Sequence, residues 1–413
     1  MHTTDRFADV RDGFRKQFGK NPTAFFSSPG RTELGGNHTD HNRGRVLAAT
    51  IDLDTVAAVG VKDGNAITVC SKGFDKPFVV DTGDVRMKPD EKGTSQALIR
   101  GIIGKLLSEG YRVGGFQAYM ASRVAIGSGL SSSASFEVLI GCLVSELFNE
   151  GAILPLMIAR AGKHAENDYF GKPCGLMDQL TCAVGGTIEI DFRDPENPDV
   201  EHLEFSPNDH GYALVVVNTG SSHSDLTNAY ASIPNDMRSV AKFLGREYCR
   251  DIERDILLSR LDEVRRACGD RAVLRCLHFL DENERVEKQC AALRARQFKE
   301  FLRLVQQSGD SSMKWLQNSF STKTPTEQPL VVAQALTDRF LSRVGGGAYR
   351  IHGGGFAGTI QAYIPTGHFD EYAHAMTKAF GKDSVARLMI RDSGVTSIHQ
   401  LPPKADPPLT GTN

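Results

Sequence analysis

A glycine- and serine-rich stretch, VAIGSGLSSSASFEVLIG at residues 124–141, carries the densest set of groups that could bind a ligand. Gly127 and Gly129 allow the backbone to approach a bound group closely. The serines at 131–133 place hydroxyl and backbone N–H donors at the positive end of a predicted apolar helix. The stretch has neither the Gly-Lys-Ser/Thr ending of a Walker A loop nor a complete GxGxxG pattern. It predicts a polyphosphate site, with a serine helix cap after a glycine turn as the simpler alternative.

A second stretch, AENDYFGKPCGLMDQLTCAVGG at residues 165–186, concentrates acidic side chains. Pro173 and Gly175 interrupt it, so Asp178 is expected to begin a new element. A carboxylate there could accept a proton from a hydroxyl nucleophile. Glu166 could join a hydroxyl oxygen in holding Mg²⁺, a cation that prefers oxygen ligands. A helix cap remains the alternative role for Asp178.

A third stretch, GRTELGGNHTDHNRGRVLAA at residues 30–49, places His38, Asp40 and His41 behind a pair of glycines. These residues could ligate a metal, hold a sugar or phosphate, or form a turn. A hydrolytic zinc site is disfavoured because neighbouring residues on a strand point to opposite faces and no HExxH motif is present. A further glycine cluster, GGGFAG at 353–358, predicts either a hairpin turn or a close backbone approach to a ligand.

Size and composition limit the classes of protein. The chain has 413 residues, 40% hydrophobic and 24% charged, which predicts a globular protein of at least two domains. A formal net charge of −2 argues against nucleic acid or an anionic membrane as a partner. The eight cysteines form no CxxC pair, and the N-terminus lacks the apolar core of a signal peptide. We expect a cytoplasmic protein with reduced thiols and no membrane span.

Hydrophobic periodicity predicts helices and strands interspersed along the chain, which indicates the α/β class. A segment rich in proline, aspartate and asparagine at 191–211 ends one unit, and a tail at 401–413 is expected to be disordered. The predicted strands are 45–52, 54–61, 66–70, 114–122, 187–192, 212–220 and two within 348–364; the predicted helices are 4–19, 94–109, 133–149, 154–167 and several within 226–320.

Four motifs in a particular order carry a resemblance to a known family. PGRTELGGNHTDHNRG is similar to the galactokinase signature, and GSGLSSSAS resembles the phosphate loop of the GHMP small-molecule kinases. PCGLMDQ looks like the segment that carries the catalytic aspartate, and HGGGFAG resembles the third GHMP motif. The resemblance extends over nearly the whole chain. It implies a two-domain α/β (α+β) fold, with an N-terminal ribosomal-S5-domain-2-like domain at 1–205, a C-terminal ferredoxin-like domain at 206–400, and the active site between them.

The resemblance also assigns roles to individual residues. Asp178 would accept the proton of the sugar hydroxyl, and Arg31 would stabilise the transferring phosphoryl group and keep Asp178 ionised. Ser133 and Glu166 would hold Mg²⁺. The loop around the ATP phosphates would be Gly127, Ser128, Gly129, Leu130, Ser131, Ser132 and Ser133, and the sugar contacts would be Asn37, His38, Asp40, Gly175 and Tyr230. Asp40, His38 and Tyr230 suit the paired hydroxyls of a hexose, whereas His41 is expected to be peripheral.

The implied reaction is ATP-dependent phosphorylation of the anomeric 1-hydroxyl of galactose, giving galactose 1-phosphate and ADP. The implied partners are therefore a small-molecule sugar, a nucleotide and Mg²⁺, and the charged faces of the C-terminal helices suit a monomer. A non-catalytic sugar sensor derived from such a kinase is the competing interpretation. A sensor would be expected to have lost the phosphate loop or the catalytic aspartate, and both are present here.

Several positions depart from the family pattern. Asn37 stands where the family has glutamate, His41 where it has tyrosine, and Ala125 where it has proline. Ser95 and Leu98 replace the aromatic residues found near the adenine pocket. A neutral amide at Asn37 would remove repulsion toward an anionic sugar. Galacturonate is therefore an alternative substrate, against a galactokinase in which Asn37 bonds to the same hydroxyl. A kinase of the same class that acts on an amino sugar, arabinose or mevalonate is a separate alternative.

Overall fold

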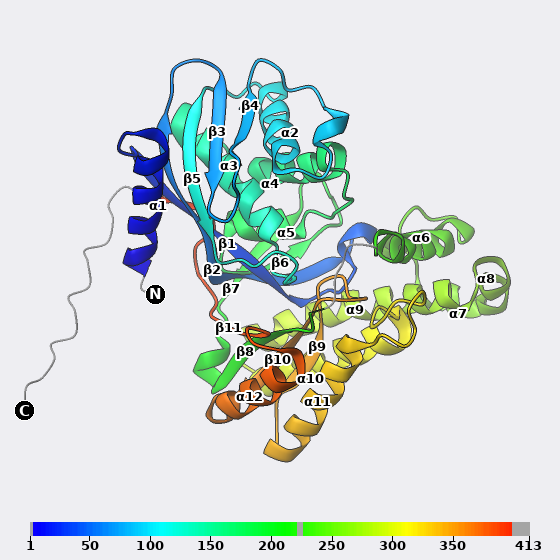
Figure 1. Cartoon of the computed structure of the whole chain (residues 1–413). Coiled ribbons are helices and arrows are strands. Elements are labelled where there is room, and N and C mark those ends of the chain that lie inside the picture. Colours follow the sequence, from blue (N-terminus) through cyan, green and yellow to red (C-terminus); the bar gives the residue numbers. More distant parts are fainter. Residues whose placement is uncertain (1–2, 221–225, 399–413) are drawn as a thin grey trace, which may run out of the picture.

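The computed structural model describes residues 3–220 and 226–398 and has a mixed α/β architecture, as predicted (Figure 1). The structure is built on two sheets whose strand pairs are mostly antiparallel, and helices cover both sheets. The tail at 401–413, for which disorder was predicted, lies outside the described residues.

The first sheet contains eight strands within the described part of the chain. Its order is β12-β1-β2-β5-β3-β4, with β6 paired to β2 and β7 paired to β6. The pair β3–β5 is parallel, and the other pairs are antiparallel. The strands are β1 (Ala24–Gly35), β2 (Arg45–Val61), β3 (Ala66–Ser71), β4 (Phe78–Asp81), β5 (Phe116–Ser122), β6 (Thr187–Asp191), β7 (Asp199–Leu203) and β12 (Thr396–Ile398).

Strand β2 corrects one prediction, because the runs expected as separate strands at 45–52 and 54–61 form one strand of 17 residues. No glycine or proline interrupts the chain at Leu53, so nothing forces a turn there. Successive β2 residues face opposite sides of the sheet: Ala57 packs among the helices on one side and Val56 among α1 residues on the other. Burial on both faces explains its nearly continuous apolar sequence.

Helices cover both faces of this sheet (Figure 1). Helix α1 (Thr3–Phe18) uses the predicted stripe of Phe7, Val10 and Phe14 to pack against β2 and β5. The larger group lies on the opposite face and shares the main hydrophobic cluster of the first sheet. Its members are α2 (Ser95–Ser108), α3 (Ser132–Phe148), α4 (Pro155–His164) and α5 (Met177–Val184).

The second sheet has the order β11-β8-β10-β9 and is antiparallel throughout. Val215 and Val217 of β8 face helices α11 and α12, whereas Leu214 and Val216 face a cluster that includes β1 and β2 residues. This cluster joins the two sheets. The elements are β8 (Tyr212–Asn218), β9 (Ala348–His352), β10 (Thr359–Pro365), β11 (Val385–Leu388), α11 (Pro329–Val344) and α12 (Phe369–Phe380).

A helical segment connects β8 to α11 and extends to one side of both sheets (Figure 1). Within it, helix α9 contacts β1, β2 and β7 of the first sheet, and α10 contacts β9 of the second. The helices of this segment are α6 (Thr227–Phe243), α7 (Arg254–Ser259), α8 (Leu261–Cys268), α9 (Asp270–Arg294) and α10 (Phe298–Ser311).

The chain crosses between the sheets more than once. It enters the second sheet at Tyr212 and returns to the first at Thr396, where β12 pairs with β1. The predicted division at residue 205 stays a prediction. Across the described ranges, no helix combines the length and the apolar composition that a bilayer span requires.

A buried ion pair links the two sheets. Arg350 of β9 donates to Glu33 of β1, and their side chains are 0% and 4% exposed. Gln361 of β10 donates to the backbone oxygen of the same Glu33 at 2.9 Å. Burying two charges is costly unless each keeps its partner, so the pair fixes how β1 meets β9.

Replacing Arg350 with methionine is expected to lower the free energy of unfolding by about 3–5 kcal/mol, because the Glu33 carboxylate would stay buried without its partner. The double variant Glu33→Gln/Arg350→Met should recover much of this loss, since no buried charge remains. Denaturant titration of both variants measures the difference. A single variant as stable as the parent would contradict the importance assigned to this pair.

Candidate active site

Arg31 lies at an irregularity of β1. The register between β1 and β2 shifts between Pro29 and Arg31, which is typical of a bulge that redirects a side chain. A Cβ atom on Gly30 would lie 2.7 Å from the carbonyl oxygen of Leu130, and the backbone N–H of Arg31 donates to that oxygen at 3.1 Å. The strand therefore touches residues 124–133, called here the Gly-Ser loop.

The Arg31 side chain joins this loop to Asp178 in the first turn of α5. Its Nε atom donates to Asp178 Oδ1 at 2.7 Å, and Nη1 donates to the Gly129 carbonyl at 2.6 Å. Ser131 Oγ donates to the other carboxylate oxygen of Asp178 at 2.6 Å. The Arg31 side chain is 6% exposed and that of Asp178 is 32% exposed. The carboxylate is therefore held on both oxygens and still accessible.

The ionisation of Asp178 follows from these contacts. Burial by itself would raise the pKa of Asp178, but the charge of Arg31 and the hydrogen bonds from Arg31 and Ser131 outweigh it and lower the pKa. Burial would likewise lower the pKa of Arg31, and the charge of Asp178 raises it instead. Both groups are therefore charged near neutral pH, and Asp178 can act as an ionised acceptor.

As predicted, the Gly-Ser loop leads into a helix, and this helix, α3, begins at Ser132. Gly127 and Gly129 have φ values of 76° and 72°, and Ser131 has 60°, so the loop uses the left-handed region repeatedly. Ser131 is the N-cap residue, yet its hydroxyl makes no capping bond and donates to Asp178 instead. The simple serine-cap interpretation is therefore wrong for Ser131. The first turn of α3 keeps N–H groups that can face an anion.

The remaining loop residues have different surroundings. Ser128 Oγ donates to the Ala125 carbonyl at 2.6 Å, and Leu130 is buried in the cluster between the sheets. A Cβ atom on Gly129 would lie 2.7 Å from Thr359 Oγ1, so only glycine fits at this contact with β10. The loop is thus anchored on both sheets.

Glu166 and Ser133 meet next to this loop. Glu166 lies in a π-helical turn, Ala165–Phe170, that follows α4. Its Oε1 atom accepts from Ser133 Oγ at 3.2 Å and from Lys172 Nζ at 2.7 Å, and its Oε2 accepts from Gln179 Nε2 at 2.9 Å. A carboxylate that already meets an ammonium group, together with a neighbouring hydroxyl oxygen, is a donor set that suits a hard cation.

Within residues 3–220 and 226–398, no three histidine, cysteine, aspartate or glutamate side chains form a cluster that could hold a metal. Glu166 and Ser133 alone supply two oxygens. A Mg²⁺ ion bound there would complete its coordination with phosphate oxygens and water, as this ion commonly does.

Residues 36–43 form a tight turn rather than a strand, so the strand-based argument against a metal here was wrong. Gly36 and His38 have positive φ values of 90° and 60°, and Asp40–Asn42 is a 3₁₀ turn. Thr39 Oγ1 donates to the Gly36 and Arg45 carbonyls at 2.9 and 2.6 Å.

His41, which was predicted to be peripheral, contacts both His38 and Asp40. His38 Nδ1 lies 2.9 Å from His41 Nε2, and His41 Nδ1 lies 3.2 Å from Asp40 Oδ1. The other nitrogen of His38 donates to the Gly354 carbonyl at 2.9 Å. Burial, with the neighbouring His41 adding to it, lowers the pKa of His38 to about 3. His38 is therefore a neutral donor, held between His41 and the hairpin.

Residues 353–358, called here the glycine hairpin, connect β9 and β10 as predicted. Tyr230 of α6 donates through its hydroxyl to the Gly355 carbonyl at 2.9 Å. A Cβ atom on Gly354 would lie 2.3 Å from the Tyr230 ring. Gly175 plays a similar part elsewhere, since a Cβ there would lie 1.7 Å from Asp40 Oδ2. The structure thus brings Tyr230 to the turn of His38, and Gly175 to Asp40.

Asn37 lies inside the protein, with 0% exposure. Its Nδ2 donates to Glu33 Oε1 at 3.1 Å and to the Gly353 carbonyl at 2.7 Å. Its Oδ1 accepts from Ser312 Oγ at 3.2 Å and from Asn318 Nδ2 at 2.9 Å. Every hydrogen-bonding position of this amide is occupied by protein, which leaves none for a sugar.

Two contributors were missed by sequence reasoning. Lys172 pairs with Glu166, and Gln179 bridges Glu166 and Glu137 with bonds of 2.9 Å to each. Both stand within the acidic segment at residues 165–186. A lysine beside a proline, six residues after Glu166, was the available signal for the first. Nothing local marks Gln179, because its role depends on the packing of α3 against α5.

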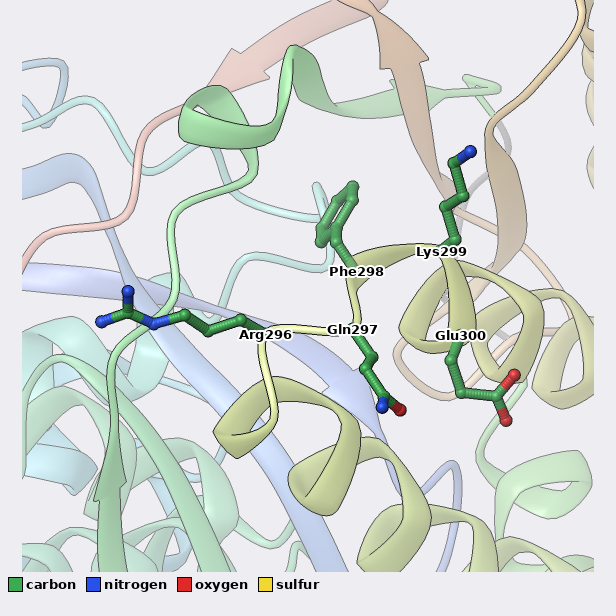
Figure 2. A pocket seen from close by; sticks show the side chains of 5 residues that line it. All are labelled: Arg296, Gln297, Phe298, Lys299 and Glu300. Carbon is green, nitrogen blue, oxygen red and sulfur yellow. The ribbon is translucent and has the colours of Figure 1, made fainter.

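A separate surface hollow lies at the turn between α9 and α10, lined by Arg296, Gln297, Phe298, Lys299 and Glu300 (Figure 2). The charged side chains point in different directions from one backbone turn. They do not converge on one point, and none of the predicted site residues lines this hollow.

Comparison with known proteins identifies two family models. Residues 12–61 match the galactokinase galactose-binding signature, and residues 97–186 match the GHMP kinases N terminal domain. The galactokinase of Clostridium tetani is 28% identical over 381 residues, covering 91% of this chain and 92% of that protein. The galactokinase of Lacticaseibacillus casei is 29% identical over 374 residues, covering 90% and 93%.

Solved structures share the fold. Lactococcus lactis galactokinase in complex with galactose matches with a TM-score of 0.81 at 23% identity, covering 94% of this chain and 99% of that one. A mevalonate kinase matches with a TM-score of 0.62 at 16% identity, covering 89% and 99%. The predicted two-domain GHMP kinase fold is confirmed.

The surroundings of Asn37 generate a prediction. Asn37→Asp would replace the donating NH₂ with an oxygen that faces Glu33 and the Gly353 carbonyl. We expect the free energy of unfolding to fall by about 2–4 kcal/mol, from two lost bonds and like-charge repulsion. Denaturant titration measures the loss, and Asn65→Asp at an exposed position is the control. Equal stability of the two variants would mean that the Asn37 network contributes little.

Proposed function

We propose that the chain is a galactokinase of the GHMP kinase family, which transfers the γ-phosphoryl group of ATP to the 1-hydroxyl of galactose. The products are galactose 1-phosphate and ADP. The observation that carries the proposal is the Arg31–Asp178 pair, which holds an ionised, partly exposed carboxylate against the Gly-Ser loop.

Asp178 is proposed to accept the proton of the attacking hydroxyl, or to orient that hydroxyl by accepting its hydrogen bond. Its lowered pKa keeps it ionised, and its contacts with Arg31 and Ser131 fix its direction. Arg31 adds positive charge next to the transferring group. Phosphoryl transfer depends mainly on positioning and charge stabilisation, which this set of residues can supply.

The Gly-Ser loop is proposed to bind the ATP phosphates through Gly127, Ser128, Gly129, Leu130, Ser131, Ser132 and Ser133. The support is the uncapped first turn of α3 and the left-handed glycines before it. Ser133 and Glu166 would hold Mg²⁺, which neutralises phosphate charge when it is bound.

The sugar is proposed to bind beside Asp178, against His38, Asp40, Gly175 and Tyr230. Asp40 can accept from two hydroxyls, and the closeness of Gly175 to Asp40 leaves no room for a larger residue there. Asn37 is proposed to support this site through the turn that it anchors and not by direct contact.

Two alternatives are weaker. A sensor without activity would have no need for an ionised Asp178 beside a phosphate-type loop, and both features are retained. A tight zinc site lacks a cluster of ligands in the described part of the chain. The chain is proposed to act as a monomer in the cytoplasm, on small molecules alone.

Asp178→Asn is expected to lower kcat by about 10²- to 10⁴-fold, because the neutral amide cannot accept the proton. Binding of galactose should change little, since the shape of the side chain is kept. ADP release with Mg·ATP and galactose gives the rate, and calorimetry gives the sugar affinity. If the variant kept full turnover, Asp178 would lose its proposed role.

Galactose should be phosphorylated and galacturonate should not. The neutral Asn37 amide already makes all of its hydrogen bonds to protein, so it has none left for an anionic sugar. The carboxylate of Asp40 would repel the carboxylate of such a sugar. ADP formation with each sugar at equal concentration decides the matter. Comparable turnover of the uronate would restore the acidic-sugar hypothesis.

A further inference from the structure

Lys172 makes a contact that neither the motifs nor the proposed reaction explain. It follows the π-helical turn, after Gly171, whose φ value is 84°. Its Nζ donates to Glu166 Oε1 at 2.7 Å, the same oxygen that accepts from Ser133 Oγ at 3.2 Å. The ammonium group therefore occupies the carboxylate oxygen at which, together with the Ser133 hydroxyl, a divalent cation would bind.

Glu166 needs a positive partner when no metal is present. The residue is 3% exposed, and Gln179 ties its Oε2 to the second buried carboxyl group of Glu137. A buried carboxylate beside another carboxyl group is costly without a neighbouring cation. Lys172 supplies that charge from the solvent side.

Lys172 can also leave this position once a metal supplies the positive charge that Glu166 needs. Its side chain is 61% exposed, so releasing Glu166 returns the ammonium to water and not to an apolar interior. Asp178 and Tyr230 also lie within the field of its charge. A released ammonium would thus remain near the position proposed for the transferring phosphoryl group.

We propose that Lys172 is a cation of the site itself that competes with the divalent metal for Glu166 Oε1, holding Glu166 in place beside Ser133 until the metal arrives with the nucleotide. The inference rests on the proposed function, because it assumes a metal at Glu166. Lys172 is a positioning residue in this scheme. The Lys172–Glu166 pair weakens the affinity of the protein for the metal alone. It also keeps Glu166 oriented in the protein without metal and nucleotide.

The test uses Mn²⁺ alone, whose free concentration is read from its electron paramagnetic resonance signal. Lys172→Met should bind Mn²⁺ more tightly than the parent, by roughly three- to tenfold, because a competing and repelling charge is gone. Lys172→Arg keeps the charge and should bind Mn²⁺ as the parent does. Lys172→Met leaves the buried Glu166 carboxylate without its partner, so denaturant titration establishes that each variant is folded before Mn²⁺ is added.

Two further variants locate the effect. Lys92→Met removes the same charge from an exposed lysine beside Gly171 and should leave Mn²⁺ binding unchanged. Glu166→Gln should weaken Mn²⁺ binding in both the parent and the Lys172→Met protein. Unchanged or weaker binding in Lys172→Met overturns the inference, as does an equal gain in Lys92→Met or full binding in Glu166→Gln.

Galactose-dependent ADP formation by the parent protein is measured in parallel. Activity together with unchanged Mn²⁺ binding in Lys172→Met would overturn the inference and leave the proposed function intact. Absence of activity with every sugar would overturn the proposed function, whatever the Mn²⁺ titrations give.

Discussion

The ion pair between Arg31 and Asp178 is the contact on which the site depends. It joins β1, the Gly-Ser loop and α5, three segments that are distant in sequence. Each partner would lose its charge more readily in a buried setting if the other were absent. Because the pair is mutually stabilised, the carboxylate can stay ionised and yet keep one side open to a substrate.

The requirement to place this pair explains features of the frame around it. The irregularity in β1 redirects Arg31, and Gly30 lets the strand touch the loop at Leu130. Ser131 takes a left-handed conformation and gives its hydroxyl to Asp178 in place of capping α3. The helix α3 therefore lacks the stabilising bond of a side-chain cap, and the Asp178 carboxylate is oriented by that hydroxyl instead. Backbone strain of this kind is common at functional sites.

The glycine hairpin forms a second unit with the sugar-type residues. Asn37, His38 and Tyr230 donate to the carbonyls of three successive glycines, at 353, 354 and 355. The buried ion pair between Glu33 of β1 and Arg350 of β9 joins the strands from which the turn at residues 36–43 and the glycine hairpin extend. Residues that could bind a sugar are thus positioned by the joint between the two sheets, so their geometry depends on how the sheets meet.

Local patterns in the sequence determined the α/β class, the stripe of α1, the start of α3, the hairpin at 348–364 and the motifs that hold Asp178 and Arg31. These features can be predicted from the sequence because periodicity and turn chemistry depend only on residues that are near one another in the chain. Only the tertiary structure decided the role of Asn37, whose partners Ser312, Asn318 and Gly353 lie 275 to 316 residues away. The pairing of Lys172 with Glu166, the bridge made by Gln179 and the link through His41 were decided in the same way. A sequence indicates that a polar side chain is present, but the fold chooses which buried donors and acceptors it meets.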